Sequence, residues 1–254
     1  MNDTGITFST EQRQQYRDEG WILLPSALQR DLVNDLRDEC DRQVVNMDEE
    51  MDRQGVSSIG ITHRDSRYFI ANIWRDNQTL IRTIFNDTMA EICRATLGSE
   101  ALLFHEQFVV KCPGGGMKFS WHQDSGYIGH EHRPYLTCWI ALDDVDESNG
   151  TVRVLPFSRA GTHQRVEHRV EDGSNDKVGY FGDDLGEPII APAGSIAVFS
   201  SVTFHTSGQN VSNRPRRAYI AQYSAEPVMS EDGAKHWNNA VPFLKDGERV
   251  DEYR

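Results

Sequence analysis

Five short β-rich segments follow Gly98, and they constrain the fold more than any other feature of the chain. Turn-forming sequences separate them, as at Pro113–Gly116 and Ser148–Gly150. Because no helical pattern lies between these segments, they favour antiparallel strands arranged as a sandwich or barrel. The segments are 101–111, 135–145, 151–157, 195–201 and 217–226. An acidic stretch that contains several glycines, 167–188, interrupts them and is expected to be a surface insertion or a lid.

The first hundred residues have a mainly helical pattern. Ser9 and Gln12 have the spacing of a capping box, and Gly20 is expected to end this first helix. We further expect a short strand at 21–25, a second helix after Ser26, a long loop at 47–67 and a third helix at about 79–97. The whole chain, 1–254, is predicted to be one domain, with helical support in 1–100, a β core in 101–227 and a C-terminal segment in 228–254.

Charge and cysteine content narrow the choice of partners and compartment. Lysine and arginine number 26 against 39 acidic residues, a formal charge of −13 that disfavours nucleic acid and anionic membrane surfaces as partners. Four cysteines lie far apart without a CxxC pair, which favours buried, reduced thiols. With no signal-peptide pattern at the N-terminus, we expect a cytoplasmic protein. The sequence does not indicate an oligomeric state.

The sequence FSWHQDSG, residues 119–126, places His122 and Asp124 two positions apart. In an extended strand these side chains would point to the same side, as two metal ligands would. His205 follows the apolar strand segment 195–201 and supplies a second imidazole. Two histidines and one carboxylate form the facial triad of non-haem Fe(II) oxygenases, which leaves coordination positions open. A hydrogen-bonded structural pair of His122 and Asp124 is the alternative.

Arg216 follows His205 by eleven residues. A buried arginine on a β core needs an anionic partner, and its planar fork suits a carboxylate. An iron triad together with such an arginine could hold a dicarboxylic keto acid at the metal. Arg216 could instead be a surface residue of the basic run RPRR.

The chain resembles the phytanoyl-CoA dioxygenase family of Fe(II)/2-oxoglutarate oxygenases along most of its length. The resemblance lies in WHQDSGY (121–127), LTCWIALDDVDESNGTVRVLPFSRAGTH (136–163), PAGSIAVFSSVTFHTSGQN (192–210) and RRAYIAQYS (216–224). It implies an α+β, mainly β fold: a double-stranded β-helix, which is a cupin-like jelly roll, with flanking N-terminal helices.

The resemblance also implies the roles of individual residues. His122, Asp124 and His205 would bind Fe(II), and Arg216 would bind the distal carboxylate of 2-oxoglutarate with support from Ser207 and Trp139. Gln107, Lys111 and Thr151 lie on expected core strands and could complete this pocket. The implied reaction consumes O₂, converts 2-oxoglutarate to succinate and CO₂, and hydroxylates or otherwise oxidises a small molecule, for which a secondary metabolite is a reasonable expectation.

The segment after the first two ligands is expected to contribute to the substrate site. Tyr127, His130 and Arg133 are its candidate substrate-binding residues, although Tyr127 could instead pack and the others could lie in a solvated loop. Other histidines, such as His105 and His168, are expected to have structural roles. Two other functions stay open: a metal-binding jelly roll without turnover, and a cupin-type enzyme that does not use 2-oxoglutarate.

Overall fold

The fold is built on two antiparallel sheets that face each other, as a computed structural model describes for residues 6–171 and 176–250. The larger sheet has the order β1 (Trp21–Leu24), β12 (Ile196–Ser200), β7 (Leu136–Ala141), β14 (Arg216–Ser224), β5 (Ala101–Lys111), β4 (Arg67–Ala71), β3 (Thr62–His63) and β2 (Ser58–Ile59). The smaller sheet has the order β11 (Glu187–Pro188), β8 (Val152–Leu155), β13 (Phe204–Ser207) and β6 (Phe119–His122). This arrangement confirms the predicted jelly roll.

Shorter strands extend this framework. β15 (Val241–Lys245) pairs with β5 and with β16 (Glu248–Arg249), so part of the C-terminal segment joins the larger sheet. β9 (Arg169–Val170) and β10 (Lys177–Val178) form a small ribbon within the expected insertion. Residues 172–175 of that insertion lie outside the described part of the chain.

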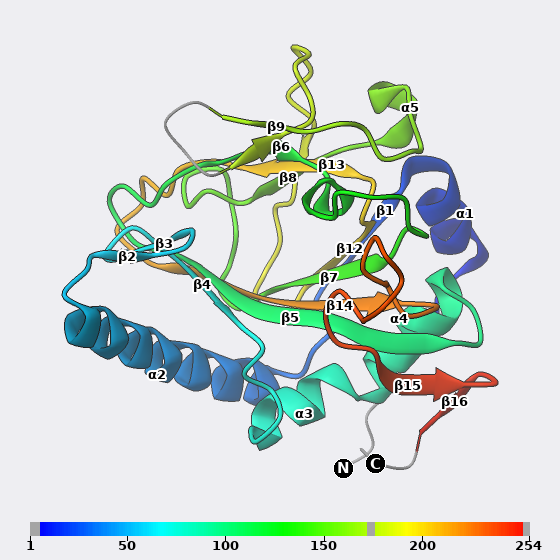
Figure 1. The fold of residues 1–254 in the computed structure, drawn as a ribbon, viewed down its shortest axis with the longest axis horizontal. Coiled ribbons are helices and arrows are strands. Elements are labelled where there is room, and N and C mark those ends of the chain that lie inside the picture. The colour runs from blue at the N-terminus through cyan, green and yellow to red at the C-terminus, as the bar shows by residue number, and fades with distance from the viewer. Residues whose placement is uncertain (1–5, 172–175, 251–254) are drawn as a thin grey trace.

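Helices cover the outer face of the larger sheet, and the smaller sheet faces its inner side (Figure 1). The helices on the outer face are α2 (Arg30–Gln54), α3 (Gln78–Ile84) and α4 (Asp87–Thr96). Side chains of β7 alternate between the two layers: Cys138 and Ile140 belong to the core under the helices, whereas Trp139 and Ala141 belong to the core between the sheets. All six residues of β7 are therefore buried.

The first helix follows its expected signals. In α1 (Thr10–Glu19), the Ser9 hydroxyl accepts a hydrogen bond from the Gln12 amide, and the Gln12 side chain accepts one from Ser9 in return. Gly20 ends the helix with φ +77°, a left-handed conformation that favours glycine. Among the described residues, no helix combines the length and apolar character needed to cross a membrane.

Two expectations for the N-terminal region are wrong. The expected loop at 47–67 begins as helix, because α2 continues to Gln54 with Met51 fully buried, and it ends as the paired strands β2 and β3. The expected single helix at 79–97 is two helices, α3 and α4. The Asn86 side chain accepts a hydrogen bond from the Met89 amide and thereby starts a new helix, which breaks the continuous pattern.

Candidate metal centre

Two strands of the smaller sheet and one tight turn bring His122, Asp124 and His205 together. His122 ends β6 and lies directly across from His205 on β13. Asp124 begins a 3₁₀ turn, η1 (Asp124–Tyr127). The strand therefore stops before Asp124, so the expected extended geometry of this pair is wrong. The turn aims the carboxylate at both imidazoles instead.

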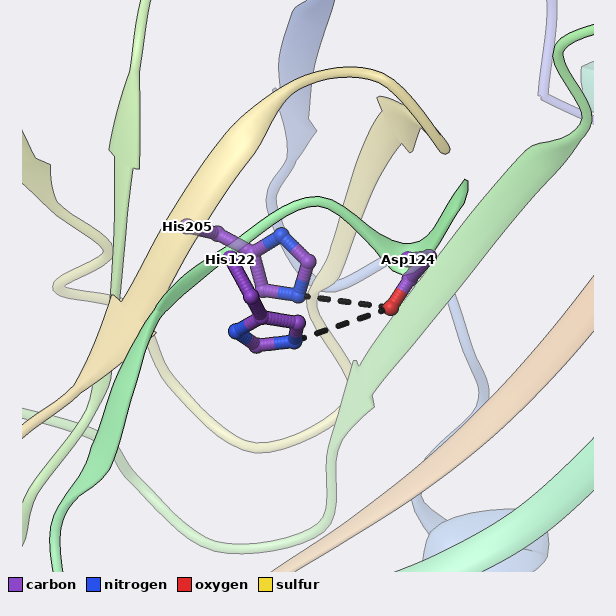
Figure 2. A group of neighbouring side chains, drawn as sticks. All are labelled: His122, Asp124 and His205. Carbon is purple, nitrogen blue, oxygen red and sulfur yellow. Dashed lines mark ion pairs between the residues drawn. The ribbon is translucent and has the colours of Figure 1, made fainter. Parts of the chain in front are cut away.

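The potential ligand atoms of these three residues all lie within 4.8 Å of one another. Asp124 Oδ1 is 3.8 Å from His122 Nε2 and 3.5 Å from His205 Nε2. Figure 2 shows the three side chains pointing toward a common space, with both imidazoles directed at the same carboxylate oxygen. These separations exceed a hydrogen bond and match ligands that converge on one ion.

Backbone carbonyls orient both imidazoles. His122 Nδ1 lies 2.7 Å from the Ser120 carbonyl, and His205 Nδ1 lies 3.1 Å from the Thr203 carbonyl. A carbonyl only accepts, so each Nδ1 carries the proton and each Nε2 lone pair is left for a metal. Burial, and then the neighbouring His205, lower the pKa of His122 well below its usual range, which keeps the ring neutral and able to coordinate.

The carboxylate of Asp124 is also held in place. Its Oδ2 accepts hydrogen bonds from Thr137 Oγ1 at 2.6 Å and from Gln222 Nε2 at 3.0 Å. The same Gln222 nitrogen lies 3.0 Å from Thr137 Oγ1, which links the two supporting side chains. Because Oδ2 is occupied, Oδ1 is the oxygen presented to both histidines and the expected metal ligand.

Removing the Thr137 hydroxyl should weaken metal binding. We expect Thr137→Val to lower Fe(II) affinity by about 10- to 100-fold, because Asp124 loses a donor that fixes its orientation. Anaerobic competition with a coloured chelator measures this affinity. Thr83→Val is the matched control, since Thr83 is equally buried but bonds to the Thr79 carbonyl in α3. Equal affinities for the two variants would contradict the orienting role.

Two imidazole nitrogens and one carboxylate oxygen on one side of a cavity are the donor set of non-haem Fe(II) centres. The cavity has a volume of about 270 Å³ and lies between the two sheets. Phe69, Phe119 and Phe199 contribute to its apolar wall. The open side of the triad therefore faces a largely apolar space in which co-substrates could reach the metal.

Arg216 lies on the wall of this cavity with only 1% of its surface exposed. Its Nη2 donates to the Gly150 carbonyl at 3.2 Å, while its Nε and Nη1 are buried with no acceptor among the described residues. Burial lowers the pKa of Arg216 to about 10, so the side chain is still charged at neutral pH. A buried cation with two unused donors matches the carboxylate of a keto acid.

Several other predicted residues line the same cavity as Arg216. Lys111 is its cross-strand neighbour and donates to the Gly208 carbonyl. The Trp139 ring lies 5.6 Å from the Arg216 guanidinium carbon, and Ser207 and Gln107 line the same cavity. The structure thus brings the expected keto-acid residues to one cavity, with the exception of Thr151.

Lys111 makes stability depend on pH. Burial, and then the nearby Arg216 and Arg67, lower the pKa of Lys111 to about 5, so the folded protein holds it neutral while the unfolded chain protonates it up to about pH 10. Because the unfolded state binds the extra proton, this residue's contribution to stability rises with pH across that range. Relative to Lys111→Met, the wild-type free energy of unfolding should therefore rise by about 1 kcal/mol per pH unit between pH 6 and 9.

Urea unfolding at several pH values measures this difference. Lys118→Met is the control, since the Lys118 side chain is 70% exposed, and it should change the slope little. Parallel pH profiles for wild type and Lys111→Met would show that Lys111 is protonated in the folded state.

Three predicted residues do not line this cavity. The Thr151 hydroxyl donates to the Ile189 carbonyl at 2.6 Å, so its expected place in the keto-acid pocket is not supported. His130 and Arg133 line a separate pocket next to residues 224–233. His130 lies against the Met229 carbonyl, whereas Arg133 is exposed. Tyr127 does line the cavity, and its ring contacts His122.

Sequence reasoning missed several residues around the metal. Thr137 and Gln222 support Asp124. Residues an even number of positions apart on a strand share a face, so Thr137, two before Trp139, and Gln222, six after Arg216, could have been predicted to face the same cavity. His105, which was expected to be structural, lines the cavity two residues before Gln107. Trp237 and Asn238 also line it, from a segment without a recognisable pattern.

Comparisons with known proteins point to one family. A family model described as phytanoyl-CoA dioxygenase (PhyH) matches residues 16–218. A protein of Stutzerimonas stutzeri named "Probable alpha-ketoglutarate-dependent hypophosphite dioxygenase" is 24% identical over 259 residues, which cover 93% of this chain and 86% of that protein.

Solved structures share the fold. EvdO2 from Micromonospora carbonacea var. aurantiaca, complexed with 2-oxoglutarate, has a TM-score of 0.69 at 19% identity and covers 93% of this chain and 96% of its own. The non-heme alpha ketoglutarate dependent carbocyclase SnoK from nogalamycin biosynthesis has a TM-score of 0.67 at 21% identity, with 88% of each chain covered.

Proposed function

The chain belongs to the phytanoyl-CoA dioxygenase family, and we propose that it is an Fe(II)- and 2-oxoglutarate-dependent oxygenase that hydroxylates, or otherwise oxidises, a small molecule. One observation carries this proposal: the open side of the His122, Asp124 and His205 group faces the cavity in which Arg216 has two buried donors without an acceptor among residues 6–171 and 176–250. A metal-binding jelly roll without turnover, or a cupin-type enzyme without a keto acid, would have no use for that arginine.

The residues divide the chemistry between them. When bound, Fe(II) with 2-oxoglutarate and O₂ supplies the oxidation, in which succinate and CO₂ form and the substrate is oxidised. His122, Asp124 and His205 would hold the iron from one side. Arg216 would fix the distal carboxylate of 2-oxoglutarate, which sets the direction in which the keto acid extends from the metal.

Other side chains shape and protect this pocket. Trp139 and Phe199 wall the keto-acid side and exclude water from it. Ser207 offers a hydroxyl in the same cavity, and Lys111, whose pKa is lowered by burial, can take up a proton when an anion binds nearby. Binding of 2-oxoglutarate would thereby place two cations beside one carboxylate.

The cellular setting is part of the proposal. The cysteines Cys40, Cys93, Cys112 and Cys138 are free thiols, which fits a reducing compartment such as the cytoplasm. Structural likeness to an enzyme of nogalamycin biosynthesis supports a role in secondary metabolism.

The test is 2-oxoglutarate turnover. Protein incubated with Fe(II), 2-oxoglutarate, O₂ and a substrate panel should release succinate, and a chelator should stop the release. Succinate formation that a chelator does not change, or no succinate with any member of the panel, would contradict the proposal. In the second case, iron binding without 2-oxoglutarate binding would support the metal-binding jelly roll instead.

A further inference from the structure

The cavity extends beyond the metal, away from Arg216. β5 places His105, Gln107 and Lys111 along it, and the register pairs Lys111 with Arg216 and His105 with Gln222. Since Gln222 holds Asp124, the metal group lies near the His105 end. A keto acid that reaches from the metal to Arg216 would occupy the other end. The space around His105, called the outer end here, is thus left for the substrate.

A β-bulge shapes this outer end. The pairing of β14 with β5 shifts between Gln222 and Tyr223, which face His105 and Leu103, so Phe104 has no partner across the ladder. Bulges redirect side chains and are common beside active sites. Here the consecutive residues Phe104 and His105 both line the cavity, although alternation would place them on opposite faces.

The walls of the outer end are apolar. The Phe104 and Tyr135 rings are 4.6 Å apart and form a small core with Ile128, and all three residues line the cavity. Trp237 lies at its edge with 47% of its surface exposed, and its ring is 5.5 Å from that of His130. An exposed tryptophan beside a cavity gives an apolar ligand a surface to cover.

No free cation serves this end among the described residues that line the cavity. Arg67 lines it but forms a two-point ion pair with Asp176, at 2.8 and 3.0 Å, and also donates to the carbonyls of Ile61 and Lys118. Lys111 and Arg216 lie at the keto-acid end. An anionic substrate group in the outer end would therefore lose its hydration without gaining a counter-ion.

The polar groups of the outer end are neutral. Asn238 Nδ2 donates to His105 Nδ1 at 2.8 Å, and Asn238 Oδ1 accepts from the Asn239 amide at 3.0 Å, which fixes the orientation of the Asn238 side chain. His105 Nδ1 is thus an acceptor, so the proton of the neutral ring is on Nε2. Burial lowers the pKa of His105, and a hydrogen bond with the Gln107 side chain, which raises this pKa, only partly offsets it. A substrate oxygen could accept from Nε2 in place of Gln107.

We propose that the outer end binds an uncharged, largely apolar molecule whose oxygen accepts a hydrogen bond from His105. The inference rests on the proposed function and specifies the substrate class of that site. The cavity of about 270 Å³, at the small end for ligand pockets, must also hold the iron and the keto acid. It therefore admits a small substrate or only the reacting part of a larger one.

Pairs of matched probes test the charge preference. Each pair consists of an amide and the carboxylate with the same ring: benzamide and benzoate, and cyclohexanecarboxamide and cyclohexanecarboxylate. Methylphosphonate represents tetrahedral anions. The protein is loaded anaerobically with Fe(II) and 2-oxoglutarate, and the visible absorption of that complex is followed as each probe is added. The amides should perturb the spectrum at concentrations at least about tenfold lower than the anions require.

Variants identify the residues that recognise the probe. His105→Ala and Asn238→Ala should each weaken amide binding by about tenfold while the affinity for 2-oxoglutarate is unchanged. His163→Ala is the matched control, since this exposed histidine does not line the cavity. Stronger binding of the carboxylates or of methylphosphonate, or no response to either amide, would overturn the inference. Failure of the complex with 2-oxoglutarate to form at all would instead overturn the proposed function.

Discussion

Replacing Asp124 by alanine should reduce succinate formation from 2-oxoglutarate to less than about 1% of the wild-type rate. Loss of a residue that only supports a ligand typically costs 10- to 100-fold in metal affinity or activity, and loss of the ligand itself costs more. The variant keeps two imidazoles but loses the one negative charge that the group offers to Fe(II). Succinate release at saturating Fe(II) and 2-oxoglutarate measures the effect.

The control for this variant is Asp232→Ala, which removes an exposed carboxylate that bonds to Ser230. It should keep the wild-type rate. Circular dichroism checks that Asp124→Ala is folded, since the substitution removes the acceptor of Thr137 Oγ1 and Gln222 Nε2 but leaves the contact between those two side chains. A succinate rate within threefold of the wild type would remove Asp124 from the ligand set.

Replacing Arg216 by alanine should raise the concentration of 2-oxoglutarate required for half-maximal turnover by about 100-fold or more. Hydrogen bonds to charged groups contribute about 1.5–3 kcal/mol each, and a two-point contact with a carboxylate contains two of them. Iron affinity should change little, since none of the three ligands bonds to Arg216 in the structure. Turnover as a function of 2-oxoglutarate concentration, with iron content measured in parallel, gives both values.

The stability of the Arg216→Ala protein provides a second readout. Two Arg216 nitrogens are buried with no acceptor in the described part of the chain, which is unfavourable, so the variant should lose less stability than burial of a side chain this large would suggest. The thermal stabilisation that 2-oxoglutarate gives the wild type should disappear. Arg214→Ala is the control, because Arg214 is an exposed neighbour. Loss of iron from Arg216→Ala alone would show a structural role.

The metal group could be predicted from sequence because its members lie next to strong local signals. His122 and Asp124 are two residues apart and His205 follows an apolar strand, but their approach depends on the pairing of β6 with β13, and the family resemblance is what joined them into one ligand set. Arg216 was a candidate because a buried arginine needs an anionic partner, and the family resemblance implied its role toward the 2-oxoglutarate carboxylate. Five core strands, β5, β7, β8, β12 and β14, could be predicted because apolar residues and turn signals delimit them, whereas β6 and β13, which carry the two histidines, lie outside the predicted segments.

The remaining site depends on contacts that no local pattern encodes. The bulge that turns Phe104 toward the cavity arises from the pairing of β5 with β14, which only the folded sheet determines. Thr151 was expected to line the pocket because it lies on a core segment. Its hydroxyl instead donates to the Ile189 carbonyl, a contact that the local sequence does not indicate. The last turns of α2 could not be predicted because residues 47–54 are mostly polar and lack a helical apolar pattern. The buried Met51 side chain packs this part of the helix against the fold.

The most direct test of the central claim is an anaerobic titration of the protein with Fe(II) and 2-oxoglutarate, followed by visible absorption. The arrangement of His122, Asp124, His205 and Arg216 predicts a weak charge-transfer band that saturates with one iron and one 2-oxoglutarate per chain and that Asp124→Ala does not form. A solution that stays colourless at saturating Fe(II) and 2-oxoglutarate would contradict the claim that this cavity holds the keto acid at an iron centre.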